Sequence, residues 1–144
     1  MNRPTITQEM KLEAAEKMCA DLKRNDWEAA DIASSYRYSM DGYELAKELE
    51  SHHWWEICAD DVGDLDTMGT YVRQVHKAAC VEWAAVNNIQ PPLPIGTTIK
   101  RGVITGLCEH EPATYLVRQH GEANDKRFLL VKFEDAVAVD LVAA

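Results

Sequence analysis

Histidine and cysteine side chains are the first candidates for chemistry, because imidazole nitrogens and thiolate sulfurs are common zinc ligands. His76 and Cys80 are four residues apart in a stretch with helical spacing, so both would lie on one face of a helix. The other candidates are His52, His53, Cys58, Cys108 and His110. Zinc sites typically combine two pairs of closely spaced Cys or His ligands, and no two pairs of these residues have that spacing. We therefore expect no metal and no cofactor, and we interpret Cys80 as a small core residue.

Four aspartates between Asp60 and Asp66 could form a calcium-binding loop. Such a loop alternates its oxygen ligands and closes with a glutamate at the twelfth position, where this chain has Tyr71 or Val72. Helix N-termini also attract acidic residues, so helix capping explains the run better.

Hydrolytic chemistry would require a nucleophile beside a base. The chain has no Gly-x-Ser-x-Gly motif, and Ser34, Ser35 and Ser39 have no nearby histidine. Gly102 and Gly106 lack the lysine and the helix that follow a phosphate-binding loop. Pairs of carboxylates are abundant but not specific. We therefore expect no active site and no enzymatic activity.

The strongest signal is the density of acidic side chains from Asp26 to Asp66. These 41 residues carry 12 Asp and Glu against one Arg and one Lys, a net charge of −10, whereas all 144 residues have a formal net charge of −9. Tyrosine and tryptophan lie between the carboxylates, and these residues often anchor protein interfaces. The pattern predicts a surface that attracts a basic partner. The residues expected to contact it are Asp41, Tyr43, Glu44, Glu48, Trp54, Trp55, Glu56, Asp60, Asp61, Asp64 and Asp66.

A structural explanation of the same residues stays open, since carboxylates cap helices and aromatic side chains fill cores. The adjacent pair Trp54 and Trp55 slightly favours the interpretation as an interface. Adjacent residues on a helix point about 100° apart, so the two indoles would not be equally buried.

Direct binding of nucleic acid is disfavoured by the net charge, because phosphates attract clustered Lys and Arg. Residues 27–36 and 42–51 have the lengths of a helix-turn-helix, but the second segment is acidic. The alternative is a transcriptional regulator that contacts nucleic acid through its C-terminal part and dimerises through its helices. The basic residues available for that contact are Lys100, Arg101, Arg118, Lys126, Arg127 and Lys132.

Hydrophobic spacing and capping signals predict four helices in residues 1–89. Thr5 with Gln8, Asn25 with Glu28, and Asp41 with Glu44 resemble capping boxes that would start the first three. The fourth and longest would begin near Asp60 or Asp61 and end near Val86.

The pattern changes near residue 90. Prolines in residues 90–96 predict a stiff connector, and short β-branched runs follow it. The candidate strands are residues 98–108, 114–118, 128–133 and 136–141, with Gly102 and Gly106 marking a bend or bulge. We therefore predict an α+β fold with three parts: an acidic α-helical domain (1–89), a proline-rich connector (90–96) and a small, strongly bent antiparallel β-sheet or β-barrel (97–144).

These observations predict a non-enzymatic protein-binding protein that docks on a basic protein or nucleoprotein complex. In size and charge it is similar to the small acidic inhibitors or accessory factors of phages and mobile elements, such as anti-CRISPR proteins. No apolar run approaches the roughly 20 residues that span a bilayer, and the N-terminus is not a secretory signal. We expect no membrane association, a cytoplasmic location and reduced thiols; a homodimer stays open.

Overall fold

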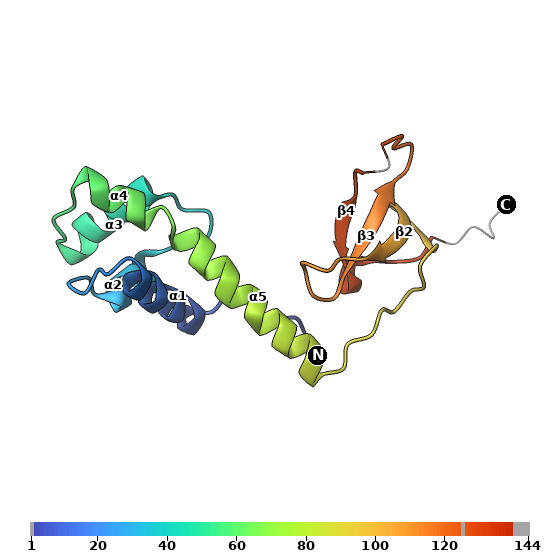
Figure 1. The fold of residues 1–144 in the computed structure, drawn as a ribbon, viewed down its shortest axis with the longest axis horizontal. Coiled ribbons are helices and arrows are strands. Elements are labelled where there is room, and N and C mark those ends of the chain that lie inside the picture. The colour runs from blue at the N-terminus through green and yellow to red at the C-terminus, as the bar shows by residue number, and fades with distance from the viewer. Residues whose placement is uncertain (1, 125, 140–144) are drawn as a thin grey trace. The chain divides into compact units, whose positions relative to one another are not determined.

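The structure, a computed structural model, describes residues 2–124 and 126–139. The chain divides into two units, one of residues 2–80 and one that begins at Val81. Each unit has a hydrophobic core of its own. Helices come first in the chain and an antiparallel sheet follows, so the predicted α+β class is confirmed (Figure 1).

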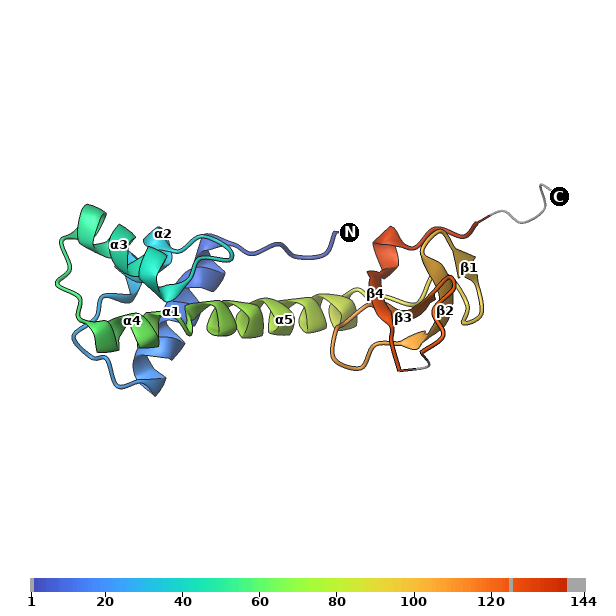
Figure 2. The ribbon, with the colours of Figure 1, turned by 90° about the horizontal axis from the view of Figure 1, so that it is seen from above.

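Over the described residues the chain forms five α-helices. They are α1 (Gln8–Asp21), α2 (Ala29–Ser35), α3 (Gly42–His53), α4 (Ala59–Leu65) and α5 (Met68–Val86). In the helical unit α1 packs on α2, α2 on α3, and α3 on α4 (Figure 2). Helix α5 begins in the helical unit, which ends at Cys80, and continues to Val86. All four predicted helical segments are present, and the last of them is divided into α4 and α5.

The core of the helical unit comes from every one of its helices. Its largest fully buried side chains are Met18, Ile32, Leu45, Leu49, Leu65, Met68 and Val72. The two residues from α3, and likewise the two from α5, are four positions apart, which places each pair on one helix face. Burial of these faces, rather than the helical propensity of short segments such as α2, holds the helices in place.

Two of the three predicted capping boxes are wrong in position. Helix α1 is capped by Thr7, whose hydroxyl accepts a hydrogen bond from the Met10 N–H at 3.2 Å. Helix α2 begins after Glu28, which makes no side-chain capping bond. The box at α3 is confirmed: the Asp41 carboxylate accepts from the Glu44 N–H at 2.8 Å, and Glu44 accepts from the Asp41 N–H.

The division between α4 and α5 has a tertiary cause. The carboxylate of Asp66 accepts a hydrogen bond from the Gly42 N–H at 2.8 Å, which ties the end of α4 to the start of α3. Thr67 then closes the turn by donating its hydroxyl to the Asp64 carbonyl at 2.7 Å. The two helix ends come so close that a Cβ on Gly42 would lie 2.7 Å from the Asp66 backbone nitrogen.

The second unit contains an antiparallel sheet. Its strands over the described residues are β1 (Thr98–Ile99), β2 (Gly102–Leu107), β3 (Thr114–Gln119) and β4 (Leu129–Lys132), in the order β1-β2-β3-β4. The register of β2 against β3 shifts between Ile104 and Gly106, so the bulge predicted in this strand is confirmed. Within residues 97–124 and 126–139 the sheet is open and does not close into a barrel.

The first and last predicted strands differ from the structure. Residues 98–108 form two strands instead of one, because the chain turns at Lys100 and Arg101 and pairs with itself. Where a strand was predicted from residue 136, a 3-10 turn (Phe133–Asp135) leads to a single bridge between Ile99 and Ala138. Residues 140 and 141 of that predicted strand lie outside the described residues.

Tyr115 organises the core of the sheet. Its ring is fully buried and lies 4.5 Å, between centroids, from the ring of Phe133. Its hydroxyl accepts from the Leu93 N–H and donates to the Leu93 carbonyl, both at 2.8 Å. One side chain therefore fastens the proline-rich segment to the sheet. Ile99, Ile104, Val117 and Val131 complete this core.

None of the helices in the described part of the chain combines the length and the apolar character needed to cross a membrane.

Candidate functional site: an acidic and aromatic surface of the helical unit

Most of the predicted contact residues lie on α3, on α4 or on the segment that joins them. The structure brings these elements together, since α3 packs against α4 and against α2. The carboxylates are nevertheless not equivalent. Some are engaged within the fold and others are exposed to solvent.

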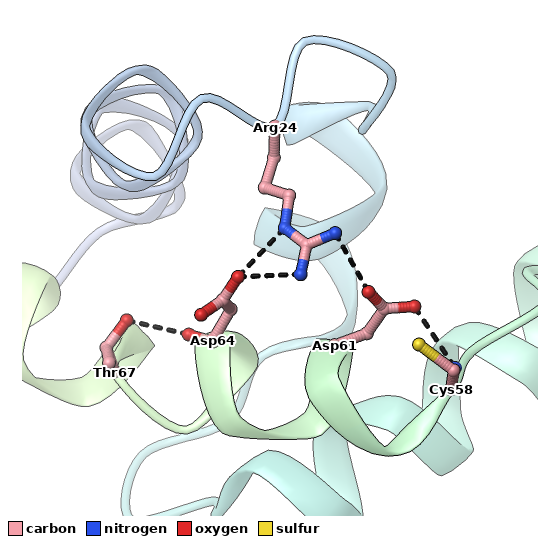
Figure 3. A network of polar contacts seen from close by, with 5 residues as sticks. All are labelled: Arg24, Cys58, Asp61, Asp64 and Thr67. Carbon is pink, nitrogen blue, oxygen red and sulfur yellow. Dashed lines mark hydrogen bonds and ion pairs between the residues drawn. The ribbon is translucent and has the colours of Figure 1, made fainter.

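Arg24 holds two of the predicted carboxylates (Figure 3). Its guanidinium lies 2.9 Å from Asp61 and 2.7 Å from Asp64, and its Nε also donates to Asp64 at 2.8 Å. Arg24 precedes the acidic run by two residues and was therefore not counted with it. With Arg24 included, residues 24–66 carry 12 acidic and three basic side chains, a net charge of −9.

The protonation properties of these groups reflect this arrangement. The backbone N–H of Cys58 donates to Asp61 at 3.1 Å, and this bond is the main reason that the pKa of Asp61 is lowered. Arg24 lowers the pKa of Asp61 further. The pKa of Arg24 is itself raised, chiefly by its hydrogen bond to Asp64. Asp61 therefore caps α4 and binds Arg24 at once.

Other predicted carboxylates also have partners inside the protein. Asp41 and Glu44 form the capping box of α3, and Asp66 binds Gly42. Glu48 lies 3.3 Å from the guanidinium of Arg37 and 3.2 Å from His52. Asp41, Glu44 and Asp66 are exposed despite these bonds; Glu56 and Asp60 are exposed too, and within the described residues their carboxylates make no hydrogen bond or ion pair.

Trp54 is the most exposed aromatic residue of this surface, with 88% of its area accessible. It ends α3 with φ 58° and ψ 33°, in the left-handed region. Glycine is the usual residue at such a position, because a Cβ is disfavoured there. Neither burial nor backbone conformation therefore explains a tryptophan at this position.

Trp55 and Tyr43 are held differently. Trp55 is half-buried against the helical core, and its indole N–H donates to Asp31 at 3.0 Å. The Tyr43 ring is exposed, and the ammonium of Lys47 lies 4.6 Å from its centroid. The unequal burial expected for the two adjacent tryptophans is confirmed, with Trp54 outside.

A shallow groove of about 420 Å³, which we call the acidic groove, is lined in part by Trp55, the residue that follows Trp54. Trp27 and Trp55 are among its lining residues, and their ring centroids are 5.7 Å apart. The Arg24 guanidinium lies 4.5 Å from the Trp27 centroid, so an arginine of this chain already makes a cation–π contact in the groove. The groove is lined by Arg24, Asp26, Trp27, Glu28, Trp55, Glu56 and Asp61.

Ser34 has a histidine partner that is distant from it in the sequence. The Oγ of Ser34 lies 3.2 Å from Nε2 of His53, and Nδ1 of His53 lies 3.2 Å from an oxygen of Asp31. The prediction that Ser34 has no nearby histidine is therefore wrong. The cause is the packing of α2 on α3, which joins residues 19 positions apart.

His76 and Cys80 do share one helix face, as expected, with Nε2 and Sγ 3.5 Å apart. The imidazole also lies 2.8 Å from the Pro4 carbonyl, which covers the pair. Within residues 2–124 and 126–139, no group of three or more His, Cys, Asp or Glu side chains is placed to hold a metal ion. The four cysteines are free thiols.

The basic residues of the sheet unit are partly engaged. Arg118 donates to the Glu122 carbonyl at 3.2 Å, and Arg127 lies 3.9 Å from the Glu122 carboxylate. Lys100 and Arg101 are exposed in the turn between β1 and β2.

No known protein family matches the chain, and the curated proteins and solved structures with which it was compared show no significant similarity to it.

Proposed function

We propose that the helical unit is a protein-binding module that docks on a positively charged surface of another protein. Trp54 is the apolar anchor of this contact, and the acidic groove receives a basic side chain. The carboxylates around the groove accelerate encounter and fix the orientation of the partner.

The exposed indole of Trp54 carries this proposal. A solvent-exposed tryptophan in the left-handed conformation at the end of a helix contributes little to the stability of the fold. A tryptophan that becomes buried in a complex is a frequent hot spot of protein interfaces. Trp54 directly precedes Trp55 and Glu56, which line the acidic groove. The proposed apolar anchor and two residues of the anionic groove are therefore consecutive in the chain.

The structure also indicates which carboxylates to test. Asp61, Asp64 and Asp66 contribute to the fold, so their replacement would disturb binding and stability together. Glu56 and Asp60 are exposed and better suited to contact a partner.

The partner class that we favour is a protein whose basic groove normally holds nucleic acid. An acidic protein can compete for such a groove because its carboxylates replace phosphates. Small acidic inhibitors of phages and mobile elements act in this way, and the support here is similarity of size and charge.

The test is affinity capture from nuclease-treated host lysate with tagged wild type and three variants. Trp54→Gly removes the anchor and suits the local backbone. Glu56→Gln with Asp60→Asn removes two charges at the surface. Glu9→Gln with Glu16→Gln removes two exposed charges from α1 and is the matched control.

We expect wild type and the α1 control to retain the same basic protein, which moderate salt releases, because exposed charges are screened. Trp54→Gly should lose it, and the double variant at Glu56 and Asp60 should weaken it several-fold. Retention by Trp54→Gly, or recovery of this chain alone, would contradict the proposal.

A transcriptional regulator acting through the sheet unit stays a prediction. It requires binding to nucleic acid that falls steeply with salt. A gel-shift assay with no retardation at about 50 mM salt would remove it.

A further inference from the structure

Ser34, His53 and Asp31 form a connected set of side chains between α2 and α3. The Ser34 hydroxyl oxygen lies 3.2 Å from Nε2 of His53, and Nδ1 of the same ring lies 3.2 Å from Oδ1 of Asp31. Serine, imidazole and carboxylate joined in this order through these atoms are the parts of a nucleophilic triad.

The surroundings favour the tautomer that such a triad requires. Because Nδ1 faces a carboxylate, the proton of a neutral ring belongs on Nδ1, and Nε2 keeps its lone pair. The second oxygen of Asp31 accepts from the Trp55 indole at 3.0 Å, which holds the carboxylate in place. Nε2 can then accept the Ser34 proton.

The Ser34 hydroxyl has a second acceptor within reach. Its oxygen lies 3.0 Å from the Asp31 backbone carbonyl, as is common for serine in a helix. Only donation to His53 makes the oxygen more nucleophilic. Ser34 is exposed, so a substrate in solution can reach it.

We propose that Ser34 is a nucleophile that accepts acyl groups from carboxylic esters, an activity distinct from the proposed binding of a basic protein. The Ser34 oxygen bonds to the ester carbonyl carbon while its proton passes to Nε2 of His53. The bond to the leaving oxygen then breaks, and that oxygen takes the proton from His53. Water later hydrolyses the acyl-serine by the same route.

Turnover is slow, because α2 does not supply backbone donors for the developing oxyanion. Ser34 lies in the last turn of this helix, and the N–H of Tyr36 is bonded to the Ile32 carbonyl at 2.9 Å. Loss of one oxyanion donor costs established hydrolases about 100- to 1,000-fold in rate. The expected signature is stoichiometric acylation followed by slow release.

The test uses the full chain with a fluorophosphonate probe, which loses fluoride when serine oxygen attacks its phosphorus. We expect one adduct per chain, mapped to Ser34 by mass spectrometry. Ser34→Ala should abolish it, and His53→Gln should slow it about 100-fold, the lower range for loss of a general base. Ser51→Ala, at an exposed serine of α3, is the matched control and should label like wild type.

Asp31 is a positioning residue, and its role has a separate readout. Nitrogen-15 NMR of the His53 ring should show the neutral tautomer protonated on Nδ1 in wild type, and a loss of that preference in Asp31→Asn. Circular dichroism establishes that each variant is folded, and His53→Asn replaces His53→Gln if the latter is not.

Labelling spread over several residues, an adduct that persists in Ser34→Ala, or an unchanged rate in a folded His53 variant would each overturn the proposal. A burst of p-nitrophenol from p-nitrophenyl acetate, equal to one per chain and absent in Ser34→Ala, would support it with a carboxylic ester itself. Absence of that burst in wild type would overturn it.

Discussion

Asp61 links the charge of the acidic surface to the stability of the fold. Its pKa is lowered in the folded protein, mainly by the Cys58 N–H and further by Arg24. A carboxyl group of this kind stabilises the fold above its unfolded pKa, about 4, and loses that effect as the pH falls through its folded pKa. We therefore expect Asp61→Asn to be less stable than wild type at pH 7, with the difference shrinking below about pH 4.

Urea unfolding at pH 7 and at about pH 2.5 measures this difference. Asp60→Asn is the matched control, because Asp60 is exposed in the same first turn of α4. At pH 7 its loss of stability should be smaller than that of Asp61→Asn, because Asp60 makes neither the capping bond nor the contact with Arg24. An equal deficit of Asp61→Asn at both pH values would contradict the assignment.

Two glycines of the helical unit should respond to alanine in opposite directions. A Cβ at Gly42 would meet backbone atoms of Val62 and Asp66, which cannot move without separating α3 from α4. A Cβ at Gly63, inside α4, would meet no atom within 4 Å. We expect Gly42→Ala to cost about 2 kcal/mol or more, and Gly63→Ala to stabilise by about 0.5–1 kcal/mol. Denaturant midpoints would show both; similar effects of the two changes would contradict this account.

At the level of elements, Tyr115 joins the proline-rich segment to the sheet through one hydroxyl. Tyr115→Phe keeps the buried ring and leaves the Leu93 N–H and carbonyl without this partner. We expect a loss of about 1–3 kcal/mol in the stability of the sheet unit. Hydrogen exchange of the Leu93 amide should accelerate, while amides in the core of α1 serve as the internal reference. Unchanged exchange at Leu93 would show that the hydroxyl does not hold the segment.

Helix ends and strand irregularities were predictable from the sequence where neighbouring residues determine them. The box of Asp41 and Glu44 and the bulge near Gly106 follow from local chemistry and are confirmed. The break after α4 was not predictable, because hydrophobic spacing continues through Asp66 while a bond to Gly42, 24 residues earlier, interrupts the helix. The pairing of β1 with β2 depends likewise on a turn that has neither proline nor glycine at its centre.

At the scale of the whole molecule, the acidic run was visible in the sequence but its internal partners were not. A count of charges does not show that Arg24 reaches Asp61 and Asp64, 37 and 40 residues further on. The same holds for Ser34 and His53, which only the packing of α2 on α3 brings together. Unequal burial of Trp54 and Trp55 was expected from helical geometry, but which of the two is exposed was not, and the exposure of Trp54 follows from the left-handed end of α3 at this residue.

The ion pairs that Arg24 forms with two carboxylates have a consequence for proteolysis. An arginine-specific protease must draw the guanidinium into its own acidic pocket, so cleavage after Arg24 requires that Asp61 and Asp64 first release it. We expect wild type to be cut after Arg37, whose side chain is 69% exposed, well before Arg24. Asp64→Asn should accelerate the cut after Arg24 and leave the cut after Arg37 unchanged, as timed mass spectrometry of the fragments would show. A short digestion would therefore report whether the ion pairs of Arg24, which connect the α1–α2 loop to α4, are formed.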